Sequence, residues 1–159
     1  MDKNESIHAR PVLLAAVALA SAAVGGLAHA GAPQPVTITT QVVFNPYTEG
    51  TFTATGPVCA TGVLEFISEK LTSGNAYNIV TLVRFHCDDN SGSFVLQYHP
   101  QVNGRPKEGF HLDGPWSVWG NGGTGAYVNL TGSGWFGVVL DFSADPVSGV
   151  ETYVGFMNP

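Results

Sequence analysis

Charged side chains are scarce in this 159-residue chain: Asp, Glu, Lys and Arg make up 11% of it, and only six residues are basic. Residues 31–159 keep four of these, Lys70, Arg84, Arg105 and Lys107, against ten acidic side chains. Nucleic acids and anionic membrane surfaces are bound by clustered Lys and Arg. The acidic balance therefore argues against both as partners of this part of the chain.

Motifs for catalysis and for cofactor binding are also missing from the sequence. It contains no nucleophile elbow and no Walker phosphate loop. His86, His99 and His111 lack the paired close spacing of zinc ligands, and we interpret them as exposed or wall residues of the fold. We therefore expect no cofactor and no metal.

Helical periodicity is absent after residue 30, and the segment is rich in Gly, Thr, Val and aromatic residues, which favours an all-β fold. Turn-forming pairs such as Asn45-Pro46 and Gly56-Pro57, and triplets such as Asp113-Gly114-Pro115, separate the runs that resemble strands. One helical turn is expected over Ala126–Leu130, and no longer helix. The predicted strands are Val36–Phe44, Gly50–Thr55, Gly62–Leu71, Tyr77–Cys87, Phe94–Val102, Phe110–Leu112, Trp116–Trp119, Trp135–Phe142 and Thr152–Met157.

Eight or nine short strands within residues 31–159 predict a single domain, either an antiparallel β-barrel or a β-sandwich. Residues 1–30 are predicted to be a signal peptide. An apolar run, Pro11–Leu27, follows a short polar start and ends at Ala28-His29-Ala30, a small-x-small cleavage site. Cleavage there leaves a secreted, extracellular chain that begins at Gly31. The alternative is a single membrane anchor, since about 20 apolar residues can cross a bilayer.

Cys59 and Cys87 are the only two cysteines. In an exported chain such a pair is expected to form a disulfide, whereas the alternative is two separate buried thiols. If the region around Ser73-Gly74 closes a hairpin, one register opposes Val63 with Val83 and Ile67 with Ile79. The same register opposes the two cysteines, which supports the disulfide.

This register also assigns faces, because alternate side chains of a strand point in opposite directions. Glu65 would share the core face with Val63, Ile67, Tyr77, Ile79, Thr81, Val83 and Phe85, joined by Phe94, Leu96 and Tyr98. In an apolar cavity its carboxyl group would have a raised pKa and could serve as a general acid or base. The alternative is a structural role, in which the Glu65 side chain points outward or is hydrogen-bonded to Thr81 or Tyr98. The opposite face, with Arg84 and His86, mixes polar and apolar side chains, which suggests that another segment of the chain or a partner subunit in a homo-oligomer covers part of it.

Several segments resemble a family of small exported bacterial proteins of unassigned activity. They are Phe52-Thr-Ala-Thr-Gly56, Cys59-Ala-Thr-Gly62, Phe85-His-Cys-Asp-Asp-Asn-Ser-Gly-Ser-Phe94, Trp116-Ser-Val-Trp119 and Gly123-Thr-Gly-Ala-Tyr-Val-Asn-Leu-Thr-Gly-Ser-Gly134. The last segment is also similar to one in the dirigent and allene oxide cyclase barrels. That resemblance implies an eight-stranded antiparallel barrel with an apolar cavity, frequent oligomerisation and, in some relatives, cyclisation or isomerisation without a cofactor. It transfers no catalytic residue to this chain.

The glycines at positions 123, 125, 132 and 134 have a structural explanation, since glycine supplies positive φ and close backbone approach. A phosphate loop is the alternative, but the Walker lysine and the long helix of the dinucleotide fold are missing.

Two functions remain open. One is a non-catalytic module that binds an apolar small molecule or a protein. The other is a cofactor-free cyclase or isomerase in which Glu65, with Tyr98 or His99, transfers protons inside the barrel.

Overall fold

The computed structural model describes residues 31–44, 48–71, 79–103 and 111–159. The predicted signal peptide, Tyr77 and the Ser73-Gly74 turn lie outside these residues. The described chain forms ten strands. They are β1 (Gln34–Phe44), β2 (Thr48–Thr55), β3 (Thr61–Leu71), β4 (Ile79–Cys87), β5 (Gly92–Tyr98), β6 (Gln101–Asn103), β7 (His111–Val118), β8 (Thr124–Gly125), β9 (Thr131–Asp141) and β10 (Ser148–Asn158).

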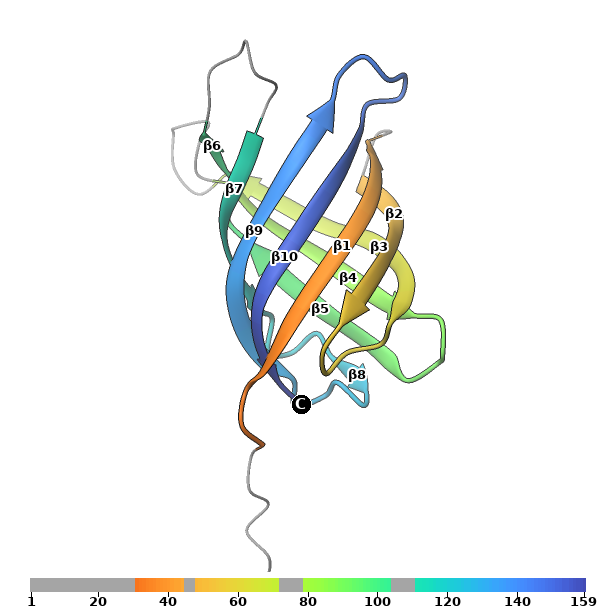
Figure 1. Cartoon of the computed structure of the whole chain (residues 1–159), viewed down its shortest axis with the longest axis vertical. Coiled ribbons are helices and arrows are strands. Elements are labelled where there is room, and N and C mark those ends of the chain that lie inside the picture. Colours follow the sequence, from red (N-terminus) through yellow and green to blue (C-terminus); the bar gives the residue numbers. More distant parts are fainter. Residues whose placement is uncertain (1–30, 45–47, 72–78, 104–110) are drawn as a thin grey trace, which may run out of the picture.

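Eight of these strands close into an antiparallel barrel in the order β1-β2-β3-β4-β5-β7-β9-β10, and β10 pairs back onto β1 (Figure 1). The short strands β6 and β8 add to the edges of β7 and β5. The predicted all-β barrel is confirmed, and the alternative sandwich is wrong. The described residues contain no helix, and residues 126–129 form a turn. No helix in this part of the chain is therefore long and apolar enough to cross a membrane.

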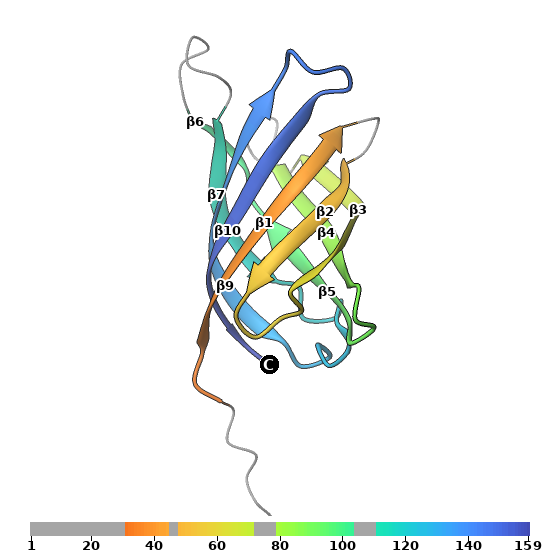
Figure 2. The ribbon, with the colours of Figure 1, turned by 45° about the vertical axis from the view of Figure 1, so that its right-hand side comes forward.

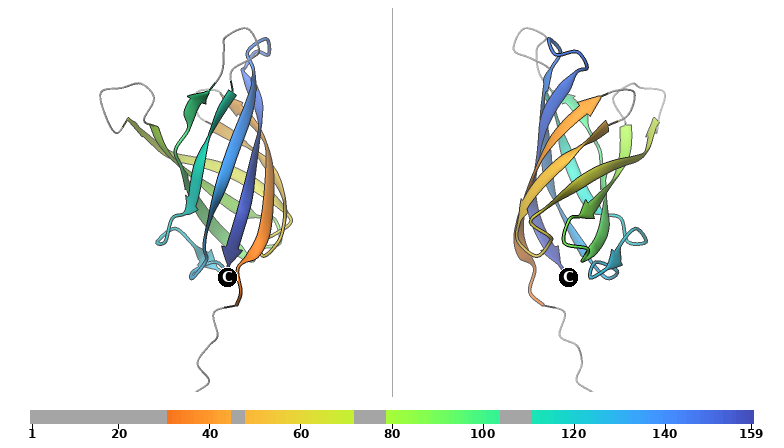
Figure 3. Two further views of the ribbon diagram at one scale, coloured as in Figure 1. Left: turned by 60° about the vertical axis from the view of Figure 1, so that its left-hand side comes forward. Right: turned by 90° about the vertical axis from the view of Figure 1, so that its right-hand side faces the viewer.

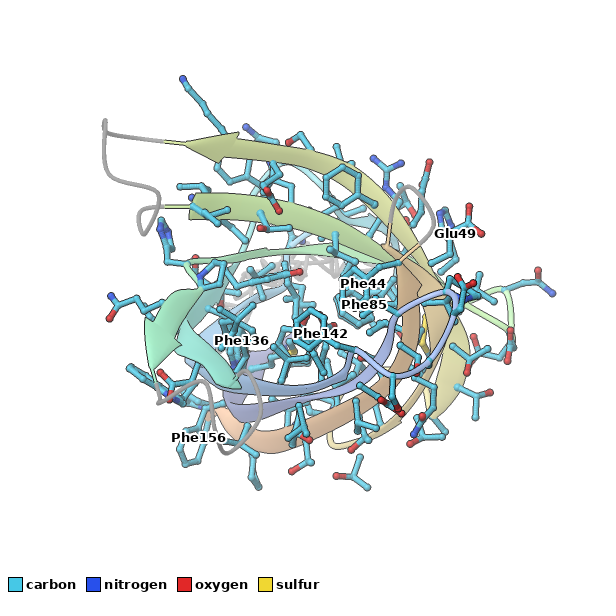
Figure 4. All side chains as sticks on the ribbon, turned by 90° about the horizontal axis from the view of Figure 1, so that it is seen from above. Phe44, Glu49, Phe85, Phe136, Phe142 and Phe156 are labelled. Carbon is cyan, nitrogen blue, oxygen red and sulfur yellow. A yellow bond between two sulfur atoms is a disulfide. The ribbon has the colours of Figure 1, made fainter. Side chains whose placement is uncertain are left out.

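The barrel interior is filled by aromatic side chains. Strand alternation turns every second residue inward, as in β1, where Val36, Ile38, Thr40 and Val42 are buried. Phe85 and Phe94 stack with ring centroids 4.9 Å apart and have no accessible surface, so no water-sized space adjoins them. Viewed from above, the labelled Phe44, Phe85 and Phe136 lie within the ring of strands, Phe142 projects over the mouth and is exposed, and Glu49 and Phe156 point outward (Figure 4).

One end of the barrel is closed by the segment between β7 and β9. Its Tyr127 and Leu130 are buried, and the Tyr127 ring meets Phe94 edge-on at 5.4 Å. The Tyr127 hydroxyl lies 3.0 Å from Ser91 Oγ in the β4–β5 turn. The first residue of β1, Gln34, pairs with Met157 near the end of β10, so both strands reach the same end of the barrel (Figure 2).

The predicted turn at Asp113-Gly114-Pro115 is wrong, because β7 runs continuously through it. Conversely, the predicted strand over Phe94–Val102 is interrupted between β5 and β6. Both pieces keep one register against β7, in which Pro100 falls opposite Gly114, and His99 N donates to Pro115 O at 3.0 Å. Proline has no N–H to donate, so the two prolines interrupt the ladder without ending β7.

The predicted register of the β3–β4 hairpin is also wrong. Val63 pairs with His86 and Glu65 with Arg84, and a β-bulge follows between Phe66 and Ser68. The change exchanges the two faces of β3: Leu64 is buried, whereas Val63, Glu65 and Ile67 are exposed. The inward face predicted for β4 and β5 is confirmed, since Thr81, Val83, Phe85, Phe94, Leu96 and Tyr98 are buried.

The disulfide between Cys59 and Cys87 is confirmed, with a Cα–Cα distance of 5.8 Å. It does not come from directly opposed strand positions, because Cys87 pairs with Gly62 and Cys59 lies in the loop before β3. The bond ties the β2–β3 loop to the end of β4. A disulfide is compatible with a secreted protein.

Candidate functional site

Glu65 lies on the outer surface of β3, not in a cavity. Its carboxylate forms an ion pair with Arg84 Nη1 at 3.1 Å and lies 2.9 Å from His86 Nε2. The hydrogen bonds from His86 and then Arg84 lower the pKa of Glu65 below its usual value of 4.5. The outward alternative for Glu65 therefore holds, and the raised pKa expected for a carboxyl group in a cavity does not apply.

The other two catalytic candidates are not brought together with Glu65. Tyr98 is buried in the barrel, and burial raises its pKa well above 10. His99 is the next residue along the chain and its backbone bonds to β7, while its Nε2 lies 3.3 Å from Gln97 Nε2. Successive strand residues face opposite sides, and Gln97 and His99 share the side away from the core. A joint proton-transfer site of Glu65, Tyr98 and His99 thus has no geometric basis.

The acidic residue inside the barrel is Glu151 on β10, which our sequence analysis missed. Its side chain is buried, and its Oε2 accepts hydrogen bonds from Thr40 Oγ1 at 3.1 Å and from the Tyr153 hydroxyl at 2.8 Å. Tyr153 also interacts with Tyr98, and Tyr98 with Thr81. Five polar side chains from β1, β4, β5 and β10 thus form one network within an aromatic core.

Burial raises the pKa of Glu151 above 4.5, and the two hydrogen bonds from neutral hydroxyl groups offset only part of that effect. The network has the chemistry of an acid–base site, a carboxyl group beside two phenols. It lacks room for a substrate, because Thr40 and Tyr153 have no accessible surface. The arrangement therefore serves the fold in this conformation, by satisfying polar groups inside an apolar barrel.

The alternation of β10 groups Glu151 with the residues that are buried, but does not mark that side as the inner one. Gly149, Glu151, Tyr153 and Met157 alternate on one side of β10, and Val150, Val154 and Phe156 alternate on the other. Both sides are largely apolar, so composition alone does not decide which one is inside.

A groove opens on the outside of the barrel at β2 and β3. It encloses about 730 Å³ and is lined by Val43, Glu49, Gly50, Thr51 and residues 63–67. β3 pairs with β2 only through Glu65 and then continues beside β4 alone, so the two strands diverge at this point (Figure 3). The bulge at Phe66–Ser68 marks the bend.

Apolar walls and carboxylates meet in this groove. Val43, Val63 and Ile67 expose 40%, 46% and 39% of their surface there. Glu49 pairs directly with Glu65 across the two strands, and Figure 4 shows Glu49 pointing away from the barrel. Like charges at directly opposed positions destabilise a sheet. Arg84 and His86 compensate Glu65, whereas Glu49 has no ion-pair partner among the described residues.

The glycines of residues 123–134 serve the backbone. A Cβ atom on Gly123, Gly125 or Gly134 would collide with the carbonyl oxygen of Tyr127, Ser91 or Val154, respectively, and Gly125 has φ +59°. Within the part of the chain that the structure describes, no group of three or more His, Cys, Asp or Glu side chains is placed to hold a metal.

Comparison with protein-family models, with curated protein sequences and with solved structures gives no match.

Proposed function

We propose that this protein is secreted and is a non-catalytic binding module for an apolar small molecule that carries a positive charge. The observation that carries the proposal is the groove between β2 and β3, in which exposed aliphatic side chains adjoin the opposed carboxylates of Glu49 and Glu65. Its volume of about 730 Å³ falls in the range of small-molecule sites.

The charge preference follows from the two glutamates. The pKa of Glu65 is lowered by its basic neighbours, so its carboxylate is ionised at neutral pH, and it already has partners. Glu49 lies opposite to it on the same outer face and supplies the uncompensated negative charge. A ligand cation placed between them removes the repulsion, while the ligand's apolar part covers Val43, Val63 and Ile67.

A homologous set of amphiphiles tests the proposal, used below their micelle concentrations: decyltrimethylammonium, neutral decanol and anionic decanoate. We expect the cation to bind and to shift the methyl NMR signals of Val63 and Ile67, with affinity in the order cation, neutral, anion. Glu49→Gln should weaken cation binding about two- to fivefold, consistent with a partly exposed ion pair. Equal affinity for all three probes, or shifts confined to residues outside the groove, would refute the charge-selective site.

Asp88→Asn is the matched control, because it also removes one exposed carboxylate but lies in the turn after β4, outside the groove. It should leave cation binding unchanged. If both variants weaken binding equally, the effect comes from the net charge of the protein and not from the groove. If the groove binds a protein and not a small amphiphile, the methyl NMR signals of Val63 and Ile67 should not shift with any of the three probes.

The second candidate is a cofactor-free cyclase or isomerase that works inside the barrel. The observation in its favour is the buried Glu151 beside Tyr153 and Tyr98, with its raised pKa. This function needs the mouth near Phe44 and Phe142 to open, since the interior is filled around the network. Its test is Glu151→Gln, which should lower turnover about 10²- to 10⁴-fold and leave the fold intact.

A further inference from the structure

We propose that two copies of this chain associate through the outer face of β9, β10 and β1, related by a two-fold axis that crosses the strands at the level of Gly137 and Thr152. This homodimer surface lies on a different set of strands from the β2–β3 groove and does not depend on the ligand proposed for it.

The face carries exposed apolar side chains on β9 and β10, small polar side chains on β1, and almost no charge. Trp135, Val139, Val150, Val154 and Phe156 expose between 39% and 59% of their surface along β9 and β10. Trp135 pairs with Val154, and Val139 with Val150, so these side chains form neighbouring rows. The outward positions of the three strands carry one charged side chain, Asp141, at the end of β9. Two copies of an acidic chain repel each other least when they meet on such a surface.

The face is also complementary to itself. Trp135, Val154 and Phe156 project from its half nearer the closed end of the barrel. The other half contains a hollow of about 400 Å³, lined by residues of β1, β9 and β10 that include Gln41, Val139 and Val150. The two halves lie about four to six residues apart, or roughly 13–20 Å along the strands. A two-fold axis across the strands places each projection on the partner's hollow, twice over, as an isologous contact requires.

Gly137 lies between the two halves and has no internal reason to be glycine. A Cβ atom there would meet only the Cβ of Asp113, at 4.0 Å, and the residue is not among those with positive φ. Glycine in a strand marks a bulge, a bend, or the close approach of a ligand or another backbone, and the pairing of β9 with β7 and β10 is regular at Gly137, without a bulge. Here the approaching backbone would be the partner's β9, at the axis.

The area of the face approaches what one partner contributes to a stable pair. Three strands of 11 residues cover about 14 Å by about 37 Å, or about 500 Å² in projection. Side chains that stand on this surface raise its accessible area toward the roughly 800 Å² that each partner contributes to a standard interface. An exposed tryptophan near the centre is the side chain most often found to dominate such contacts.

The test compares Val154→Glu with Val63→Glu. Both valines expose 46% of their surface on outward strand positions, but only Val154 lies on the proposed face. Sedimentation equilibrium of the protein produced from the full chain should give twice the mass of one polypeptide. Val154→Glu should weaken association roughly 100-fold or more, because it leaves a charge without a partner in the contact, and Val63→Glu should leave association unchanged. Circular dichroism checks that both variants fold.

Cross-linking tests the position of the axis. The native cysteines form the disulfide, so a new cysteine is the only free thiol. A short bis-maleimide should join two chains through Thr152→Cys, which is exposed at the level of the axis, and should not join them through Val63→Cys. A monomer at millimolar concentration, a mass of three or more chains, or equal dimerisation of Val154→Glu and the parent protein would overturn the proposal.

Discussion

The Tyr153 hydroxyl donates a 2.8 Å hydrogen bond to the Glu151 carboxylate two residues earlier on β10, and both side chains point into the barrel. The pair places an ionisable group where its charge is opposed by burial and supported only by neutral hydroxyl groups. This relationship makes the stability of the fold depend on pH.

Glu151→Gln should become relatively more stable than the parent protein as pH rises. Burial raises the folded-state pKa of Glu151 above its usual value of 4.5. Between pH 4.5 and that raised pKa the folded state binds more protons than the unfolded state, so the free energy of unfolding falls as pH rises through this range. Gln does not titrate. Urea unfolding of both proteins from pH 4 to pH 8 should show that the unfolding free energy of Glu151→Gln, minus that of the parent protein, increases with pH. A constant difference would contradict the raised pKa.

Glu65 should behave in the opposite way. Hydrogen bonds from His86 and Arg84 lower its pKa below 4.5, so its contribution to stability is present above 4.5 and is lost as pH falls through the folded-state pKa. Carbon-detected NMR titration of the side-chain carboxyl should show this low pKa. His86→Ala, which removes the largest cause, should return it toward 4.5, whereas unchanged titration in that variant would contradict the assignment.

The disulfide should account for a sizeable part of the stability. Its two cysteines are 28 residues apart, and removing the bond by Cys59→Ser with Cys87→Ser should lower the unfolding free energy by about 3–4 kcal/mol on the chain-entropy account. The native protein should have a mass two hydrogens below the reduced value. Stoichiometric reaction of native protein with a thiol reagent would disprove the bond.

Exported protein should begin at Gly31, because Ala28-His29-Ala30 has the small-x-small pattern of a signal peptidase site. Mass spectrometry of the culture medium gives the N-terminus directly. Full-length chain retained in the membrane fraction would instead establish the anchor.

Gly134→Ala should destabilise the barrel by more than about 1 kcal/mol, because the added methyl group meets the Val154 carbonyl on the neighbouring strand. Gly120→Ala is the control, since a Cβ atom there has nothing within 4 Å. Thermal unfolding measures both. Neither variant should change affinity for ATP or NAD, because we expect no nucleotide binding. Measurable nucleotide affinity that is lost in Gly134→Ala would support the phosphate-loop alternative.

The strand pattern, the disulfide and the inward sides of β4 and β5 could be predicted from the sequence, because β-branched and aromatic runs alternate clearly there. The face of β3 could not. A shift of one residue reverses a strand, and Val63, Leu64, Phe66 and Ile67 give both of its sides an apolar character. The bulge after Phe66 changes the register again, and nothing in local composition marks it.

The same ambiguity misplaced the acidic candidate. Glu65 and Glu151 each occupy a strand between apolar neighbours, and only the pairing of whole strands puts one outside and the other inside. The outer side of β10 carries apolar side chains such as Val154 and Phe156. An antiparallel strand with one face in water usually has polar side chains on that face, so this pattern points to the wrong side.

The pairing of Gln34 with Met157 determines which end of the barrel faces a support attached to either terminus. Both ends of the described chain leave from the pole that Tyr127 and Leu130 seal. A support attached to either terminus, whether a retained leader in a bilayer or an affinity tag on a bead, therefore holds the sealed pole toward it. The end of the barrel around Phe142 then points into the medium, so immobilised protein should keep that end uncovered.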